Sequence, residues 1–115
     1  MADVVYFVRD LLFVSKIREA AEQLGIGVAP ARDLDTLERE AAGARLVIVD
    51  LRLADAMAAL ERLARQPNAA TVRTVGFVDH ERIDLMEAAK ALGCGRVLAK
   101  GQLAAELPRL LAPAA

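Results

Sequence analysis

A short apolar run that ends in a carboxylate is the feature of this sequence that most constrains its fold. Residues 46–49, LVIV, contain no polar position, and Asp50 follows directly. A strand without polar alternation must be covered on both faces, which is typical of a parallel sheet with helices on either side. The carboxyl end of such a strand is where open α/β sheets bind ligands, although an acid there also serves to end the strand and cap the next helix.

Four further apolar runs alternate with helix-period segments along the chain. The strands are expected at residues 4–8, 26–29, 45–50, 72–78 and 96–100. The helices are expected at residues 12–24, 35–42, 55–65, 81–92 and 102–111. This alternation predicts an α/β fold with a five-stranded, parallel, doubly wound sheet, in one domain over residues 1–115. Asp35 and Glu38 are the expected capping pair of the second helix, and Gly76 predicts a close approach to the fourth strand.

The composition argues against several classes of protein. The formal net charge of −1 over 115 residues offers no basic surface for nucleic acid or an anionic membrane. No apolar run approaches the roughly eighteen residues that span a bilayer, and the first residues do not resemble a signal peptide. Cys94 is the single cysteine, which excludes an internal disulfide and fits a reducing compartment. We therefore expect a soluble cytoplasmic domain that binds neither nucleic acid nor membrane.

Charged residues follow four of the five expected strands. Asp10, Asp50 and Asp79 come after the first, third and fourth strands, and Lys100 ends the fifth. Because the carboxyl ends of parallel strands share one edge of a sheet, these groups are expected to converge. Three carboxylates in a small space repel one another and need a cation, which is either Lys100 or a hard metal ion such as Mg²⁺.

Together these segments resemble the receiver domain of two-component response regulators, the CheY-like family. The resemblance covers essentially the whole chain and is strongest at residues 93–100, GCGRVLAK, which are similar to the family's stretch before its last helix. It implies the same doubly wound fold, with Asp50 as the acceptor of a phosphoryl group. It also implies Mg²⁺ bound by Asp10 and Asp50, and a contact between Lys100 and the phosphoryl oxygens.

Several residues depart from the family's pattern. Arg9 replaces the first of two adjacent acids, which weakens Mg²⁺ binding by repulsion and by the loss of a ligand. Asp79 stands at the family's Ser or Thr, where an acid repels an aspartyl phosphate. Val97 replaces the aromatic switch residue, Gly101 replaces a proline, and residues 51–54 replace a Pro-Gly loop. The chain therefore resembles a degenerate receiver, or pseudo-receiver.

Three functions stay open at this point. The first is a stand-alone module that binds another protein without phosphorylation. Such a module is no enzyme and needs no cofactor. Its charged residues would form a structural ion-pair network of Asp50, Asp79, Lys100 and Arg9. The second is a working receiver, at most self-phosphorylating and self-dephosphorylating at Asp50, in which Asp79 stands in for the Mg²⁺ ligand lost at Arg9. The third is a doubly wound domain that binds a small ligand at its switch point.

The resemblance also suggests where a partner would dock. Receivers commonly use their fourth helix, fifth strand and fifth helix, which correspond here to the region from Glu87 to Leu111. Four leucines in this region share one helical face that either covers the sheet or offers surplus apolar area to a partner or a homodimer: Leu103, Leu107, Leu110 and Leu111. His80 and Cys94 lack the companion residues of a metal site, and charges such as Glu38 and Arg62 are expected on solvated helix faces.

Overall fold

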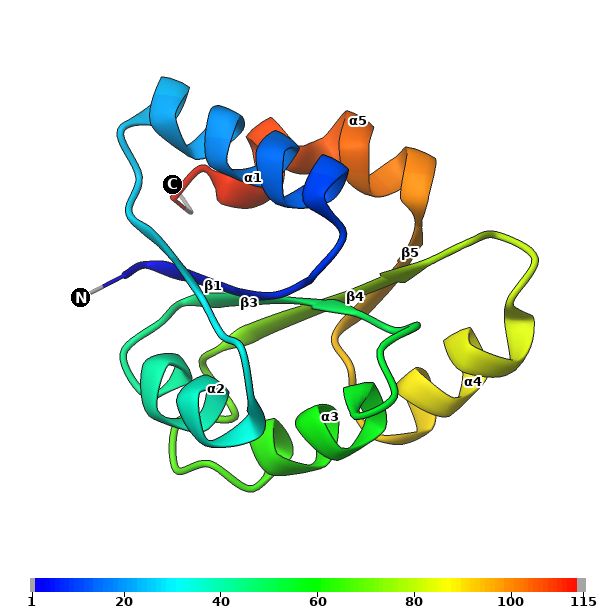
Figure 1. Ribbon diagram of the computed structural model, residues 1–115. Coiled ribbons are helices and arrows are strands. Elements are labelled where there is room, and N and C mark those ends of the chain that lie inside the picture. The colour runs from blue at the N-terminus through cyan, green and yellow to red at the C-terminus, as the bar shows by residue number, and fades with distance from the viewer. Residues whose placement is uncertain (1, 114–115) are drawn as a thin grey trace.

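The structure is a computed structural model that describes residues 2–113, and in this range it has five strands and five helices (Figure 1). The strands are β1 (Val4–Phe7), β2 (Val28–Pro30), β3 (Leu46–Asp50), β4 (Arg73–Val78) and β5 (Arg96–Ala99). The helices are α1 (Leu11–Leu24), α2 (Leu34–Ala41), α3 (Ala56–Ala64), α4 (Ile83–Ala91) and α5 (Lys100–Leu111). The strands are all parallel in the order β2-β1-β3-β4-β5, which confirms the predicted doubly wound sheet.

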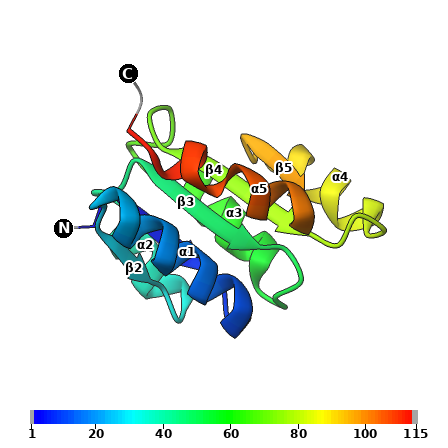
Figure 2. The ribbon, with the colours of Figure 1, turned by 90° about the horizontal axis from the view of Figure 1, so that it is seen from above.

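Helices cover both faces of this sheet. α1 and α5 lie on one face, and α2, α3 and α4 lie on the other (Figures 1 and 2). Along β3, Leu46 and Ile48 belong to the apolar cluster beneath α1 and α5, whereas Val47 and Val49 belong to the cluster beneath the other three helices. Every residue of β3 is buried, so the absence of polar alternation in its sequence follows from burial on both sides.

Local chemistry explains where α1 ends and where α2 begins. α1 stops at Gly25, whose φ of 68° is the left-handed conformation that glycine adopts without strain. α2 begins at Leu34, so the residue before it, Asp33, caps the helix by accepting a hydrogen bond from the Thr36 N–H at 2.7 Å. The prediction of Asp35 as the cap is wrong, because Asp35 lies inside the first turn. No helix within residues 2–113 is long and apolar enough to cross a membrane.

Most boundaries differ from the prediction by one or two residues, two of them notably, and one close approach is confirmed. β2 includes Pro30, which an edge strand tolerates although proline has no N–H to donate. Lys100 is the first residue of α5 rather than the last of β5. Gly76 packs directly on Leu51, since a Cβ at position 76 would lie 2.9 Å from the Leu51 Cδ2. This packing fixes the start of the turn that follows Asp50.

Candidate functional site

The charged residues that follow the strands lie at one edge of the sheet, on the right of Figure 1. β1 leads into Asp10, β3 ends at Asp50, and β4 leads into Asp79. Lys100 opens α5 directly after β5. The parallel topology brings these positions together because every strand has its carboxyl end on this side. We call the group formed by Asp10, Asp50, Arg52, Asp79 and Lys100 the acid edge.

Asp50 is the buried member of the acid edge, with 3% of its surface exposed. Its Oδ1 accepts a hydrogen bond from the Arg52 backbone N–H at 3.0 Å. A carboxylate that binds the backbone two residues later closes a tight turn, so Asp50 shapes the loop after β3. The next N–H, that of Leu51, continues the sheet by donating to the Phe77 carbonyl at 3.0 Å. Within residues 2–113 the Asp50 side chain makes no ion pair.

Asp79 and Lys100 form the shortest ion pair of the acid edge. The Lys100 Nζ lies 3.1 Å from the Asp79 Oδ1. The hydrogen bond from Lys100 lowers the pKa of the Asp79 carboxyl, and the nearby charges of Lys100, Arg52 and Arg82 lower it further. The same amine lies 5.7 Å from the centre of the Phe13 ring, within range of a cation–π contact. The Lys100 side chain therefore extends back from the start of α5 into the acid edge.

Arg52 is a second cation of the acid edge, and it was not predicted from the sequence. One guanidinium nitrogen lies 3.8 Å from the Asp10 Oδ2, and another lies 3.6 Å from the Asp79 Oδ2. The side chain is 41% exposed and forms no hydrogen bond to either acid. One signal for it was available in the sequence, because Arg52 follows the strand-ending Asp50 by two positions and so emerges at the same edge.

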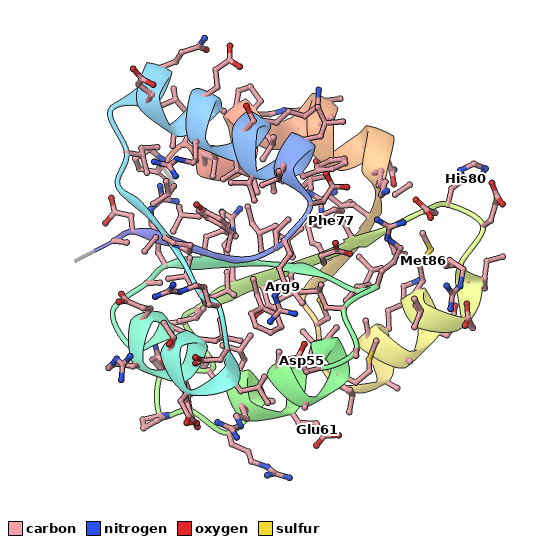
Figure 3. All side chains as sticks on the ribbon, viewed as in Figure 1. Arg9, Asp55, Glu61, Phe77, His80 and Met86 are labelled. Carbon is pink, nitrogen blue, oxygen red and sulfur yellow. The ribbon has the colours of Figure 1, made fainter. Side chains whose placement is uncertain are left out.

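Arg9 does not join the acid edge, so the prediction that it belongs to the ion-pair network there is wrong. Its guanidinium donates to the Arg32 carbonyl at 2.6 Å and lies 3.9 Å from the Asp55 Oδ2. It also lies 5.4 Å from the centre of the Phe7 ring. Figure 3 shows the Arg9 side chain directed toward Asp55, before α3. Arg9 thus links the loop before α2, at Arg32, to the loop before α3, at Asp55. Both loops lie on the face of the sheet that α2, α3 and α4 cover.

The arrangement does not fit a preformed Mg²⁺ site. Within residues 2–113, no group of three or more His, Cys, Asp or Glu side chains is placed to hold a metal ion. Asp10 and Asp50 line an open hollow of about 520 Å³, but Arg52 and Arg82 line it as well. Asp10 also uses its Oδ1 to cap α1. Since two guanidinium groups oppose a divalent cation, Mg²⁺ binding there requires Arg52 to leave the acids.

His80 lies beside the acid edge but outside its contacts. Its side chain is 79% exposed and points away from the protein in Figure 3. Its Nε2 lies 3.8 Å from the Glu81 Oε1, on a similarly exposed neighbour. This placement agrees with a solvated histidine at the start of a helix rather than a ligand of the site.

No protein-family model and no curated protein matches the sequence. Solved structures do match. One is the receiver domain of the sensor histidine kinase PA1611 from Pseudomonas aeruginosa, which has a magnesium ion coordinated in its active site cleft. It aligns with a TM-score of 0.75 and 20% identity over 96% of this chain and 97% of that chain. Another is the receiver domain of NtrX from Brucella abortus, with a TM-score of 0.75 and 20% identity over 91% of each chain.

A third match is the phosphorylated cyanobacterial phytochrome response regulator RcpA, with a TM-score of 0.74 and 16% identity over 95% of this chain and 91% of that chain. The chain has the receiver-domain fold. In two longer NtrX chains from Brucella abortus, the chain corresponds to 24% and 26% of the length. The receiver-domain fold thus occurs in these structures both alone and within larger proteins. At these identities the likeness establishes the fold, and the function has to be argued from the acid edge itself.

Proposed function

We propose that the chain is a receiver-like signalling module that acts by binding another protein, without phosphorylation of Asp50. The observation that carries the proposal is the position of Arg52 between Asp10 and Asp79, 3.8 Å and 3.6 Å from their carboxylates. Lys100 neutralises the other side of Asp79 at 3.1 Å. The acid edge therefore has its own cations, and the module has no enzymatic activity in this proposal.

Electrostatics support this proposal in two ways. Phosphoryl transfer to a carboxylate depends on positioning and on a cation that neutralises the developing charge, which is usually a divalent metal ion. Arg52 weakens the attraction of Asp10 and Asp50 for such an ion, because like charges repel across short distances. Asp79 adds a negative charge at the same edge, so a phosphoryl group on Asp50 would be repelled by it.

The predicted partner surface, between Glu87 and Leu111, exposes several charged side chains, among them Lys90 and Arg109. The four leucines of α5 are buried among the apolar residues beneath α1 and α5, which confirms the interpretation that they cover the sheet. This surface also carries the ion pair between the exposed Arg96 and the half-buried Glu106, 2.8 Å apart. A partner protein or a second copy of the chain would therefore meet charged groups here, and its affinity would fall with added salt.

Adding beryllofluoride, a mimic of aspartyl phosphate, tests the proposal. Amide NMR spectra of the purified protein are recorded with Mg²⁺ alone and with Mg²⁺ plus beryllofluoride. We expect no saturable shifts at Asp50, Asp79 or Lys100 upon either addition. Saturable shifts that appear with beryllofluoride and disappear in Asp50→Asn would contradict the proposal.

A working receiver is the second candidate, and one observation favours it. Asp50 lines the open hollow at the acid edge, together with Arg52 and Arg82, whose positive charges attract a phosphoryl group. In this alternative, Arg52 moves away from Asp10 when Mg²⁺ binds. The beryllofluoride experiment separates the two candidates, because a working receiver responds to Mg²⁺ and the mimic together.

A further inference from the structure

We propose that a cavity at the end of the sheet opposite the acid edge binds a small uncharged molecule with an apolar body and one hydrogen-bonding group. The cavity has a volume of about 440 Å³. It lies between the ends of α3 and α4, which cover the same face of the sheet (Figure 1), and the first residues of β4 and β5. The volume falls within the roughly 300–1,000 Å³ of small-molecule sites.

Apolar side chains make up much of the cavity wall. Leu60 and Leu63 contribute from α3, Val72 from just before β4, and Leu92 from just after α4. All four belong to the apolar cluster beneath α2, α3 and α4 or pack against it. A wall of this composition suits an apolar body, which gains free energy by leaving water.

Small residues leave this space open. Ala64, Ala69, Gly93 and Gly95 all line the cavity, and none has a side chain large enough to fill it. At Gly95 a Cβ would lie 3.2 Å from the Thr74 carbonyl oxygen, so a larger residue there would crowd β4. The space between the ends of α3 and α4 is therefore lined by side chains rather than filled by them.

The two arginines at this end of the sheet point away from the cavity. Arg73 and Arg96 are the only charged residues that line it within residues 2–113. Each lies two positions before a residue of the apolar cluster beneath α1 and α5, namely Val75 and Leu98. Side chains two positions apart on a strand share a face, and Arg96 indeed reaches Glu106 on α5 at 2.8 Å. The cavity thus favours an uncharged ligand, because a charge buried without a partner is costly.

Thr74 supplies the polar group of the cavity. It alternates along the strand with Val75, and it lies two positions after Val72 and four before Val78, which both belong to or pack against the cluster beneath α2, α3 and α4. Its side chain therefore points toward α3 and α4 and into the cavity that it lines. The residue is half-buried, and within residues 2–113 its hydroxyl has no hydrogen-bond partner. This hydroxyl can donate a hydrogen bond to a ligand or accept one from it.

Cys94 contributes surface rather than reactivity. Burial raises the pKa of its thiol, so the reactive thiolate form is disfavoured. The thiol donates a hydrogen bond to the Arg96 carbonyl at 3.2 Å, so its hydrogen is already used. We therefore assign non-covalent binding to this cavity, with the sulfur as a polarisable part of its wall.

The cavity and the acid edge are at opposite ends of β4. Arg73 begins this strand of six residues and Asp79 follows it, so the two sites are about 20 Å apart along the chain direction at roughly 3.3 Å per residue. The proposal does not depend on whether Asp50 is phosphorylated, because none of its residues belongs to the acid edge.

Amide NMR titration with three probes that share one ring system tests the proposal. The probes are 2-naphthol, naphthalene and 2-naphthoate, which carry a hydroxyl, no polar group and a carboxylate. We expect saturable binding of one 2-naphthol per chain, with amide shifts centred on Leu63, Val72 and Cys94. Naphthalene should bind about five-fold more weakly, the effect of one hydrogen bond. Naphthoate should bind more weakly still, because its charge finds no partner in the cavity.

One variant tests the hydroxyl of the cavity. Thr74→Val replaces the hydroxyl by a methyl group and keeps the branched shape that suits a strand. In this variant 2-naphthol should lose its five-fold advantage over naphthalene. The matched control is Thr71→Val, at an exposed position outside the cavity wall whose hydroxyl donates to the Asn68 carbonyl at 3.0 Å. The control should keep the advantage of 2-naphthol.

A second variant tests the space. Ala64→Trp replaces a small, exposed wall residue by a large one and should weaken binding of 2-naphthol about ten-fold or more by occupying the cavity. The matched control is Ala105→Trp on α5, which lies outside the cavity and should leave the affinity unchanged.

Four results would overturn the proposal. The first is a titration with 2-naphthol that does not saturate or whose amide shifts lie away from the cavity. The second is binding of 2-naphthoate as tight as that of 2-naphthol. The third is an advantage of 2-naphthol over naphthalene that survives in Thr74→Val, and the fourth is equal loss of affinity in a variant and its control. Thermal unfolding shows that each variant is folded before the titration, and Thr74→Val tests the site even if Ala64→Trp unfolds.

Discussion

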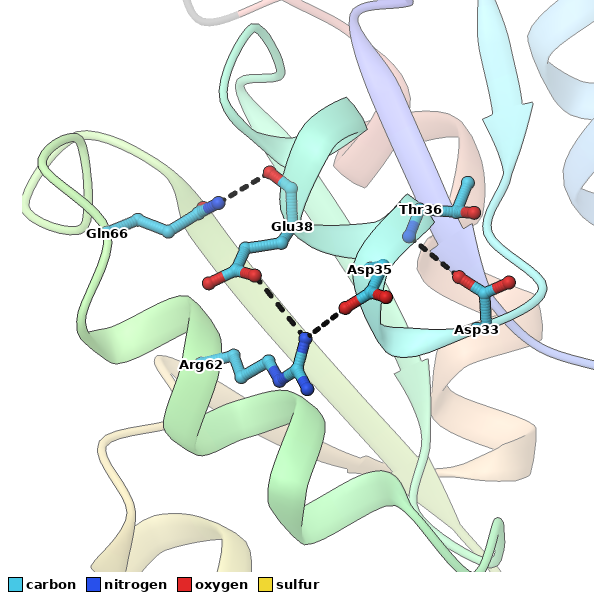
Figure 4. A network of polar contacts seen from close by, with 6 residues as sticks. All are labelled: Asp33, Asp35, Thr36, Glu38, Arg62 and Gln66. Atoms are coloured by element: carbon cyan, nitrogen blue, oxygen red, sulfur yellow. Dashed lines mark hydrogen bonds and ion pairs between the residues drawn. The ribbon is translucent and has the colours of Figure 1, made fainter.

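Two arginines of this protein each lie between two acids, and they do so in different ways. Arg62 on α3 faces α2, where its Nη1 donates to the Asp35 Oδ1 at 2.8 Å and to the Glu38 Oε2 at 3.4 Å (Figure 4). Its hydrogen bond with Asp35 raises the pKa of the Arg62 guanidinium. Gln66 adds a further link by donating to the Glu38 carbonyl at 2.6 Å. This network joins two neighbouring helices by direct hydrogen bonds.

Arg52 has the same kind of neighbours without the hydrogen bonds. Its guanidinium lies 3.8 Å and 3.6 Å from the carboxylates of Asp10 and Asp79. The comparison indicates that Arg62 is a structural link, whereas Arg52 balances the charge of an edge where three acids gather. A cation that balances charge can be replaced by another cation, but a hydrogen-bonded link cannot. The following predictions use this difference.

The largest expected effect comes from loosening the turn that carries Arg52. Leu51 is 1% exposed and packs on Gly76, so Leu51→Ala leaves a void beneath the turn. We expect a loss of about 3 kcal/mol in the free energy of unfolding, measured by urea denaturation. Leu53→Ala, at a half-buried position of the same turn, is the matched control and should cost less. Equal losses in both variants would show that the packing of Leu51 on Gly76 does not anchor the turn.

A smaller effect separates the two arginines directly. Arg52→Gln and Arg62→Gln should each lower the thermal midpoint by a few degrees in the absence of divalent ions. Adding Mg²⁺ should restore the midpoint of Arg52→Gln, because the freed carboxylates of Asp10 and Asp79 then bind the ion. It should leave Arg62→Gln unchanged. If Mg²⁺ restored the thermal midpoint of both variants, or of neither, the two arginines would not differ as charge balance and structural link.

The smallest effect is a change in the pH dependence of stability. The pKa of Asp79 is lowered in the folded protein, first by its hydrogen bond with Lys100, so the unfolded chain binds more protons in acid. The stability that this pair contributes is therefore present above the unfolded pKa of about 4 and is lost as the pH falls through the lower folded value. In both Asp79→Asn and Lys100→Met, the free energy of unfolding measured by urea denaturation should fall less than in the wild type as the pH is lowered.

Other carboxyls keep part of the pH dependence in those variants, because hydrogen bonds also lower the pKa values of Asp33, Asp84 and Glu106. A pH profile that is identical in the wild type and in both variants would contradict the role given to the pair of Asp79 and Lys100.

Much of the fold follows from the sequence because it depends on strong and regular signals. The unbroken apolar run at residues 46–49 requires burial on both faces, and the alternation of strands with helices restricts the topology to a doubly wound sheet. The convergence of Asp79 and Lys100 follows from the same topology, since the carboxyl ends of parallel strands share an edge. The 3.1 Å distance between these side chains confirms that part of the prediction.

The directions of the exposed arginines could not be predicted in this way. Arg9 and Arg52 both emerge at the ends of strands, but Arg9 extends to Asp55 and Arg32 while Arg52 extends over the acids. Long side chains at the surface choose among partners whose energies differ by only about 1 kcal/mol or less. Arg62 lies on an exposed helix face as expected, but its ion pairs with Asp35 and Glu38 on another helix could not be predicted for the same reason.

The measurement that tests the central claim most directly is the mass of the intact protein after incubation with Mg²⁺ and acetyl phosphate, a small phosphoryl donor. Since Arg52 and Lys100 already balance two of the three acids of the acid edge, we predict that the wild-type mass does not change. A gain of one phosphoryl group that Asp50→Asn abolishes would contradict it, and would make the chain a working receiver.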